Sequence, residues 1–471
     1  MRRSSTTSPA RQRRVSGARL AAVALVAVVA GVAVSVGVRP GTDTVVPQVP
    51  PPDPAFVDAA SADQPAAPNE ILGDVVTLFE RGDLTSALRD KAFAAARSVG
   101  AGHGTGRGFT ALMSSIRRGS LVVQEAQAPG WAFPMAVTAF PPDVIRGLMG
   151  RDMSARVGGT SVVMGESSAS FHRVEVGDTI QFGIGPFVSY AVGHIAPDAE
   201  VGGTEILMTV EQAARIGGTV DTRVVIFPPF DQLELTAALN SMGLLGNSNV
   251  RVRTTWDPFD PDSTLSLIET KEALGEFDID YGSLTEAGWT AIDAGWKAAN
   301  LPAEREPYAG GINARCHFAI RGALRDALTE VATNYPWLIN SRPTGIDVAN
   351  TNQYGGCSIG LARFSRYGAA VGTISRHSWG QAIDMSTVDN CQGCVPQFSC
   401  LIVRTFRKHG FSWGGNYLRP DGMHFEWVGE PRHTQQYPSK YCPNLPTVQP
   451  VGTADFDPRA ELFADDGVTL E

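Results

Sequence analysis

The chain has 471 residues, which suggests two or three domains, and 43% of them are hydrophobic, enough for packed cores. Its formal net charge is -9 and no basic patch lies in the body of the chain, so nucleic acid is excluded as an expected partner. The 50 Gly and 31 Pro residues indicate a chain rich in turns, without the composition of collagen.

The amino terminus joins a basic segment to an apolar one. Residues 1–19 contain six arginines and no acidic residue, and residues 20–38 read LAAVALVAVVAGVAVSVGV, without a charge. A helix of this length just spans a bilayer core, and its basic flank is expected to stay in the cytoplasm. A cleaved signal peptide is the alternative, but its apolar part is usually about 7–15 residues long. We therefore expect a single transmembrane helix in the cell membrane, with the rest of the chain outside.

Two regions follow the apolar segment. Residues 39–70 include VPQVPPPDP and are expected to form an extended Pro-rich linker. Residues 71–280 have no cysteine and mix helical with strand patterns, which predicts an α+β domain. Helices are predicted in LTSALRDKAFAAARSVG (84–100) and DQLELTAALNSMG (231–243). Strands are predicted in GSLVVQEA (119–126) and RVVIFPPF (223–230), and VEVGDTIQFG (174–183) predicts two short strands around a Gly-Asp turn.

The order of these patterns, from VGDTIQF to DQLELTAALNSMG, resembles extracytoplasmic domains of bacterial ABC-type permeases. The resemblance covers part of the region and includes no chemical motif. Its histidines, His103, His172 and His194, are scattered, so each is expected to be structural rather than a ligand. We interpret 71–280 as a module that positions the chain or binds a protein partner.

Residues 281–445 carry two further helical patterns. In RGALRDALTEVATNYPWLI (321–339) the apolar residues Leu324, Ala327, Leu328 and Val331 recur at helical spacing, so this helix is expected to face a core. The pattern returns in QFSCLIVRTFRKHG (397–410), with Phe398, Leu401, Ile402 and Phe406. The acidic tail, 446–471, is predicted to be disordered.

All six cysteines lie in this same part of the chain. An even number of cysteines in an exported domain predicts a disulfide framework, although six cysteines allow fifteen pairings and the sequence does not choose among them. The stretch CQGC (391–394) also fits a redox site or a structural zinc site. Oxidised structural cysteines are the favoured interpretation because the domain is expected outside the cytoplasm.

Two stretches that flank the second helix supply metal-ligating side chains. SRHSWGQAID (375–384) contains His377 and Asp384, and GFSWGGNYLRPDGMHFEW (410–427) contains His424. Two imidazoles and one carboxylate are a donor set for catalytic zinc, Zn2+, which keeps one position open for water. Asp421, three residues before His424, is then left near the metal as a general base. Each residue alone also has a structural interpretation, and Pro-Asp-Gly is an ordinary turn signal.

These stretches together resemble the zinc peptidases of the D-alanyl-D-alanine carboxypeptidase type, whose motif is Ser-x-His-x-x-Gly-x-Ala-x-Asp followed by an acid-x-x-His. The resemblance covers about Cys316 to Val428. It implies a domain with a small antiparallel sheet and flanking helices. It also implies that His377, Asp384 and His424 bind zinc, and that Asp421 activates the attacking water.

The resemblance implies further roles. Ser375 is expected to contact the substrate, and Arg363 is the best candidate for the arginine that binds substrate and oxyanion, with Arg366 and Arg376 as alternatives. Many D,D-carboxypeptidases have Glu where this chain has Asp421, and the Asp form resembles the endolysin-type endopeptidases. Glu426 is the alternative base.

The sequence thus predicts an extracellular zinc peptidase, held by one membrane helix, that hydrolyses peptidoglycan stem peptides as an endopeptidase or a D,D-carboxypeptidase. The alternative is a membrane protein without activity that binds the cell wall or scaffolds a complex.

Overall fold

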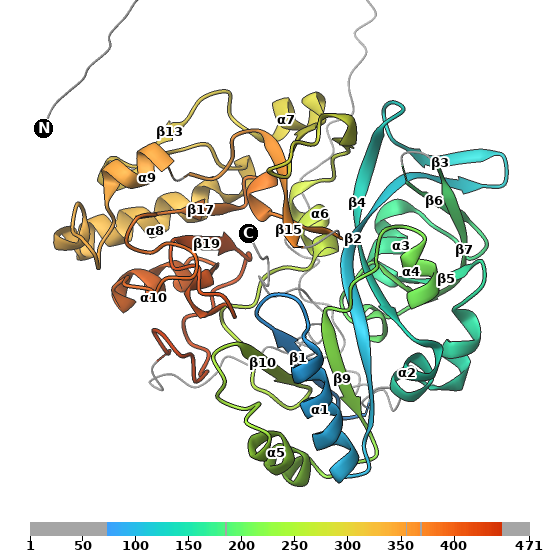
Figure 1. Cartoon of the computed structure of the whole chain (residues 1–471). Helices are drawn as coiled ribbons and strands as arrows, with labels where there is room; N and C mark the ends of the chain where they lie inside the picture. The colour runs from blue at the N-terminus through green and yellow to red at the C-terminus, as the bar shows by residue number, and fades with distance from the viewer. Residues whose placement is uncertain (1–72, 184–185, 355, 368–369, 445–471) are drawn as a thin grey trace, which may run out of the picture. The chain divides into compact units, whose positions relative to one another are not determined.

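The computed structural model describes residues 73–183, 186–354, 356–367 and 370–444 (Figure 1). They belong to one compact unit, Ala66–Glu471. The basic segment 1–19, the expected membrane helix 20–38, the Pro-rich linker 39–70 and the acidic tail 446–471 lie outside the described residues. Among the helices that are described, none is both long and apolar enough to cross a bilayer.

The first part of the described chain mixes a large sheet with short helices, as the α+β prediction requires. Its strands are β1 (Val76–Glu80), β2 (Gly102–Arg118), β3 (Leu121–Glu125), β4 (Trp131–Phe140), β5 (Ser161–Gly165), β6 (Thr179–Phe182), β7 (Val188–Ala196), β8 (Ile206–Thr209), β9 (Arg223–Phe227) and β10 (Val250–Thr254). Its helices are α1 (Ser86–Ser98), α2 (Pro142–Arg156), α3 (Glu166–His172), α4 (Val210–Ala214), α5 (Gln232–Ser241) and α6 (Leu267–Leu274).

The second part carries shorter strands and four helices. The strands are β11 (Ile279–Asp280), β12 (Trp289–Ile292), β13 (Glu306–Pro307), β14 (Asn313–Ala314), β15 (Leu361–Tyr367), β16 (Ala370–Ile374), β17 (Ala382–Asp384), β18 (Phe411–Trp413) and β19 (His424–Trp427). The helices are α7 (Ala294–Asn300), α8 (Arg321–Asn334), α9 (Val348–Tyr354) and α10 (Cys400–Lys408).

One hydrogen-bonded sheet runs through both parts. Its strand order is β10-β1-β9-β2-β6-β7-β5-β8-β4-β11-β12-β15-β16, with β3 beside β2 and a further pairing of β2 with β4. The joint lies at β4, where Trp131 and Ala132 pair with Asp280 and Ile279 of β11. Residue 280, the expected boundary between the α+β domain and the cysteine-bearing region, therefore lies inside a sheet rather than in a linker.

The helices with clear apolar periodicity form where the sequence predicts them. The hydroxyl of Thr85 caps α1 by accepting a hydrogen bond from Leu88 N. The buried face of α8 is the predicted one, with Leu324, Ala327, Leu328 and Val331. Helix α1 buries Leu88, Ala92, Ala95 and Ala96. Helix α1 packs against α5 and against β2 and β9 of the sheet, and α8 packs against α10 (Figure 1).

Two local predictions are wrong in part. In 174–183 only Thr179–Phe182 is a strand, because the Asp178 carboxylate accepts a hydrogen bond from Glu175 N at 2.9 Å and pairs with Arg118, which stabilises a turn instead. In 397–410 the helix begins at Cys400, capped by Ser399, so Phe398 is buried ahead of the helix. Leu401 is then 37% exposed rather than in the core.

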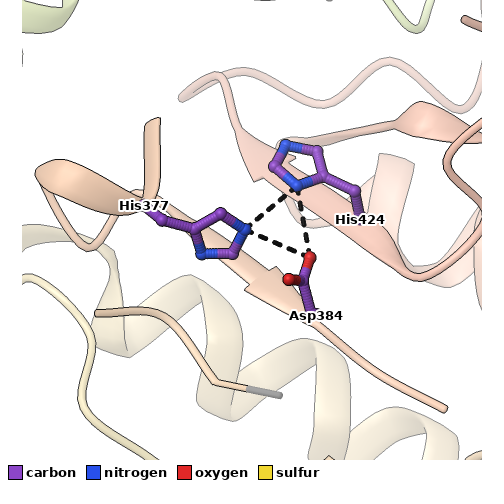
Figure 2. A group of neighbouring side chains, drawn as sticks. All are labelled: His377, Asp384 and His424. Carbon is purple, nitrogen blue, oxygen red and sulfur yellow. Dashed lines mark hydrogen bonds and ion pairs between the residues drawn. The ribbon is translucent and has the colours of Figure 1, made fainter. Parts of the chain in front are cut away.

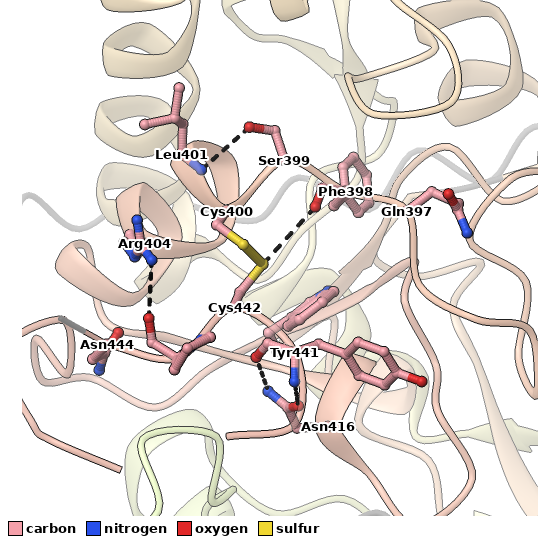
Figure 3. Close-up of a disulfide and its surroundings, with 12 residues drawn as sticks. Gln397, Phe398, Ser399, Cys400, Leu401, Arg404, Asn416, Tyr441, Cys442 and Asn444 are labelled. Atoms are coloured by element: carbon pink, nitrogen blue, oxygen red, sulfur yellow. Dashed lines mark hydrogen bonds between the residues drawn. A yellow bond between two sulfur atoms is a disulfide. The ribbon is translucent and has the colours of Figure 1, made fainter. Parts of the chain in front are cut away.

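The disulfide framework is confirmed, and its pairing is now resolved. The bonds are Cys316–Cys357, Cys391–Cys394 and Cys400–Cys442. Figure 3 shows the third bond, which ties the first residue of α10 to the segment near Tyr441. The two cysteines of CQGC bond to each other, so in this structure neither is a thiolate that could bind zinc.

Candidate metal centre

Three side chains from separate short elements converge at one point. His377 lies in a 3-10 turn, Arg376–Ser378, that follows β16. Asp384 is the last residue of β17 and His424 the first of β19, and these two residues are paired across the antiparallel sheet β17-β19-β18. Cross-strand partners project to the same face, which brings both side chains toward His377 (Figure 2).

The donor atoms are close together. His377 Nε2 lies 3.1 Å from Asp384 Oδ1 and 3.2 Å from His424 Nδ1, and His424 Nδ1 lies 3.3 Å from Asp384 Oδ1. The side chains are 18%, 21% and 11% exposed for His377, Asp384 and His424, so the cluster is reachable from solvent yet mostly enclosed. No other group of histidine, cysteine and acidic side chains in the described chain has metal-binding geometry.

The opposite ring nitrogens are already used. His377 Nδ1 donates to the Cys357 carbonyl oxygen at 2.8 Å, and His424 Nε2 donates to Glu426 Oε2 at 3.3 Å. With these protons in place, His377 Nε2 and His424 Nδ1 both carry lone pairs. When both rings are neutral, two lone pairs and a carboxylate oxygen then face one another, an arrangement that a bound cation satisfies. The residues therefore fit a metal ion, and two imidazoles with one carboxylate fit zinc.

Without a bound cation, the electrostatics of the cluster favour an ionised Asp384 beside protonated imidazoles. Burial alone would raise the pKa of Asp384, but the neighbouring His377 and His424 hold it well below its usual range. Burial alone would lower the pKa of His424, but its hydrogen bonds with Asp384 and Glu426 raise it well above its usual range. The carboxylate is thus ionised at all ordinary pH values. Protons compete with a cation for the imidazoles, so metal binding is expected to weaken as the pH falls.

Asp421 lies beside the cluster without joining it. Its N–H donates to Gly414 O at 2.8 Å and its carbonyl accepts from His424 N at 3.1 Å, which holds the loop before β19. It is 7% exposed, and it lines the same cavity as the three donor residues. Its charge is one of those that raise the pKa of His424. Asp421 therefore borders the same cavity as the three donor residues, and its role as a base stays a prediction.

Glu426, the alternative base, is held behind His424. Its Oε2 accepts from His424 Nε2, and its Oε1 lies 3.4 Å from Arg376 Nε. Arg376 in turn donates to the Leu265 carbonyl at 2.7 Å. These contacts give Glu426 and Arg376 a part in orienting His424.

The remaining candidate residues, Ser375 and Arg363, both line the second cavity beside the cluster. Arg363 packs over the Trp289 ring, 5.1 Å from its centroid, and its carbonyl accepts from Ser375 N. The Ser375 hydroxyl accepts from His377 N at 3.4 Å, so this serine also supports the turn that carries the histidine. The side chain of Arg366 lies outside what the structure describes.

Two cavities meet at the cluster. The first, which we call the β2-side cavity, has a volume of about 90 Å³ and contains Asp421 and His424 in its wall. The second, the arginine cavity, has a volume of about 240 Å³ and is lined by Arg305, Arg315 and Arg363. Both share three lining residues: Ser375, His377 and Asp384. A peptide crossing the cluster would therefore find room on either side of it.

The arginine cavity contains residues that the sequence analysis did not find. Arg315 donates through Nε to the Ser358 carbonyl at 3.1 Å. Burial, together with the nearby charge of Arg305, lowers the pKa of Arg315. Both arginines lie far upstream of the motif and follow no pattern of spacing, so only the three-dimensional structure brings them to the cluster.

Comparisons with known proteins agree with the peptidase motif. Residues 369–427 match a family model described as D-alanyl-D-alanine carboxypeptidase. No curated protein matches the chain. A solved domain from Porphyromonas gingivalis, described as a permease protein, is 12% identical over 40% of this chain and 89% of that chain, with a TM-score of 0.23. The segment that carries His377, Asp384, Asp421 and His424 is thus similar to the D-alanyl-D-alanine carboxypeptidase family, which indicates a peptidase.

Proposed function

We propose that this protein is a zinc-dependent peptidase that hydrolyses peptide bonds in peptidoglycan stem peptides. The observation that carries the proposal is the convergence of His377 Nε2, His424 Nδ1 and Asp384 Oδ1 to within 3.3 Å of one another. The match of residues 369–427 to the carboxypeptidase family supports the substrate class.

His377, Asp384 and His424 would hold the zinc ion. Bound there, zinc supplies a Lewis acid that acidifies water toward a pKa of about 7 and polarises the scissile carbonyl. Asp421 takes the proton of the attacking water and returns it to the departing amine. Arg363, in the wall of the arginine cavity, donates to the carbonyl oxygen as negative charge develops on it. Ser375 contacts the substrate where the two cavities meet.

Cleavage is proposed to take place outside the cell. The apolar residues 20–38 behind six arginines support a membrane anchor, and three disulfides support an oxidising compartment. The two cavities that flank the cluster support cleavage with substrate residues on both sides, as in an endopeptidase. The arginine cavity would equally accept the terminal carboxylate of a D,D-carboxypeptidase substrate.

The test is digestion of purified peptidoglycan by the full-length, zinc-loaded protein, with the new chain termini identified by mass spectrometry. New amino termini within cross-links would indicate an endopeptidase, and release of single D-alanine residues would indicate a carboxypeptidase. The His377→Ala variant is the matched control. A protein that contains one zinc ion per chain and releases nothing from peptidoglycan would contradict the proposal and favour a role in binding the wall.

A further inference from the structure

The Cys391–Cys394 disulfide closes a small ring of backbone beside the metal centre. Its two cysteines are 3 positions apart in the sequence, whereas the other two disulfides join residues 41 and 42 positions apart. A disulfide stabilises a fold mainly by restricting the unfolded chain, and the effect grows with the length of the loop that it closes. The Cys391–Cys394 bond therefore contributes the least of the three to global stability, and its effect on the protein is local.

Solvent reaches this bond more easily than the others. Cys316 and Cys357 are both fully buried, and Cys442 of the third bond is 7% exposed. Among the three disulfides, Cys391–Cys394 is the one in which both cysteines are partly exposed. Access to the sulfur is one of the factors that set how fast a thiolate attacks a disulfide. The Cys391–Cys394 bond is therefore expected to exchange with an added thiol before the other two.

A third cavity gives access to Cys394. It has a volume of about 630 Å³, and its walls include Asn247 and Ser248 ahead of β10. Val395, next to Cys394, lines the same cavity and is 62% exposed. Cavities of about 300–1,000 Å³ accommodate small ligands. A thiol-bearing molecule consequently has room beside Cys394.

The cysteine loop, as we call residues 390–396, pairs with the loop that carries Asp421. Gln392 and Asp421 form an isolated antiparallel bridge. Next to this bridge, Gly393 N donates to the Pro420 carbonyl at 2.5 Å. The disulfide restricts the backbone of the two residues between its cysteines because it closes them into a ring. The bond thus restrains the segment against which Asp421 is paired.

Packing holds the same two loops together. Met423 N donates to the carbonyl of Asn390, which is fully buried, at 2.8 Å. A Cβ atom on Gly422 would lie 3.1 Å from Pro396 Cβ and 3.2 Å from Asn390 Cβ, so the two loops are in close contact there. A change in the conformation of the cysteine loop is therefore transmitted to Asp421, the residue before Gly422.

We propose that Cys391–Cys394 is a thiol–disulfide exchange site, and that its reduction by a dithiol loosens the loop that carries Asp421 and slows hydrolysis. The effect on hydrolysis rests on the peptidase function proposed above, whereas the exchange itself does not. The proposal gives the stretch CQGC a redox role in addition to its structural one.

The reaction balances with a dithiol as the reductant. One thiolate of the dithiol attacks the sulfur of Cys394, which forms a mixed disulfide and breaks the bond to Cys391. The second thiolate then attacks the sulfur of the reductant in the mixed disulfide and releases Cys394. Two electrons pass to the protein, the reductant becomes a disulfide, and its two protons end on Cys391 and Cys394.

The first measurement is the order in which the disulfides are reduced. The full-length, zinc-loaded protein is titrated with dithiothreitol, and the free thiols are mapped by alkylation and mass spectrometry. Cys391 and Cys394 should react at a concentration at least about tenfold lower than Cys316 and Cys357, because the latter are buried. Reduction of the buried bonds first, or of all three bonds together, would overturn the exchange site.

A short peptide with two cysteines in the same spacing is the second reductant in this measurement. Faster reduction of Cys391–Cys394 by the peptide than by dithiothreitol would assign the reductant to a protein with two cysteines. Equal rates would assign it to a small dithiol. Both results support the exchange site, and they differ in the source of the dithiol.

The second measurement is the state of the loop that carries Asp421. At the dithiothreitol concentration that reduces only Cys391–Cys394, amide hydrogen exchange around Met423 should become at least about fivefold faster, with exchange in α8 unchanged. The kcat should fall about tenfold because the base is less precisely placed, with zinc content unchanged. Exchange around Met423 within twofold of its value in the oxidised protein would overturn the proposal.

The matched control is the double variant Cys391→Ser/Cys394→Ser. Its exchange around Met423 and its kcat should equal those of the reduced wild type, and neither should respond to dithiothreitol. A variant that responds as strongly as the wild type would place the effect in another bond or in loss of zinc, and would overturn the proposal. If the variant does not fold, the titration of the wild type decides alone.

Failure of the peptidase function is distinguishable from failure of the exchange site. A wild type that hydrolyses no peptide, but whose exchange around Met423 responds to reduction of Cys391–Cys394, would contradict the peptidase function and leave the exchange site supported.

Discussion

The two parts of the chain each bury a cluster of histidine and carboxylate side chains, and the clusters differ in one respect. In the first part, His172, Glu205 and Glu276 surround Lys271, whose Nζ lies 2.7 Å from Glu205 and 2.8 Å from Glu276. In the metal centre, by contrast, neither lysine nor arginine of the described chain is paired with His377, Asp384 or His424.

The presence or absence of a lysine within the cluster distinguishes a buried structural cluster from a candidate metal-binding site. The Lys271 ammonium supplies the cation for the first cluster, and Gln124 Oε1 accepts a hydrogen bond from His172 Nδ1 at 2.7 Å. Burial alone would raise the pKa of Glu205, yet Lys271 and His172 hold it below its usual range. In the second cluster, no lysine or arginine among the described residues supplies a cation, which agrees with the zinc ion that we propose for it.

The largest expected effect is loss of the metal. His377→Ala removes one of three ligands and leaves Asp384 and His424 without their shared partner, so zinc binding and peptidase activity should both be abolished while the fold persists. Elemental analysis and circular dichroism check this. Full zinc occupancy in the variant would mean that His377 is not a zinc ligand, and the proposed difference between the two clusters would not hold.

Breaking the first cluster should instead cost stability. Lys271→Met leaves two buried carboxylates without their cation, which typically destabilises a protein by about 3–5 kcal/mol. The folded variant should still bind one zinc ion per chain. Thermal unfolding with Lys91→Met, an exposed lysine of α1, as the control measures the effect. A stability equal to that of the wild type would mean that Lys271 is not what balances the cluster.

The role of Asp421 is tested by a change that keeps its shape. Asp421→Asn retains the size and the turn preference of the residue but cannot take a proton. Hydrolysis should fall at least about a hundredfold, since positioned general bases contribute roughly 10²–10⁴-fold in rate. Zinc content and melting temperature should stay unchanged. Loss of zinc along with activity would make Asp421 a ligand.

The smallest of the expected effects concerns the residue behind His424. Glu426→Gln keeps an oxygen for His424 Nε2 but removes the charge, and losses of this kind typically weaken metal affinity or activity about 10–100-fold. Titration with a zinc-competing chelator should show the weaker affinity. Unchanged affinity with abolished hydrolysis would instead assign the base to Glu426.

The parts of the structure that depend on neighbouring residues could be predicted from the sequence. The buried face of α8 follows from its apolar spacing, and the donors of the metal centre follow from two short stretches around α10. Asp384 and His424, one from each of these stretches, are paired across β17 and β19 at the ends of the two strands.

The parts that depend on contacts between distant segments could not be predicted. Arg305 and Arg315 line a cavity beside the cluster only because remote segments of the chain fold together. The turn at Asp178 overrides a strand pattern because a side chain competes for backbone hydrogen bonds. The pairing of the six cysteines depends on which of them are close in the folded chain, and their spacing in the sequence does not determine this.

The Cys316–Cys357 disulfide has a consequence for when the protein matures. The carbonyl that fixes the tautomer of His377 belongs to Cys357, so a covalent bond anchors the acceptor on which a metal ligand depends. In a reducing environment the chain would lack that bond, and the His377 side chain is expected to be held less firmly there. Full assembly of the three donor residues is thereby expected to depend on oxidation of Cys316 and Cys357.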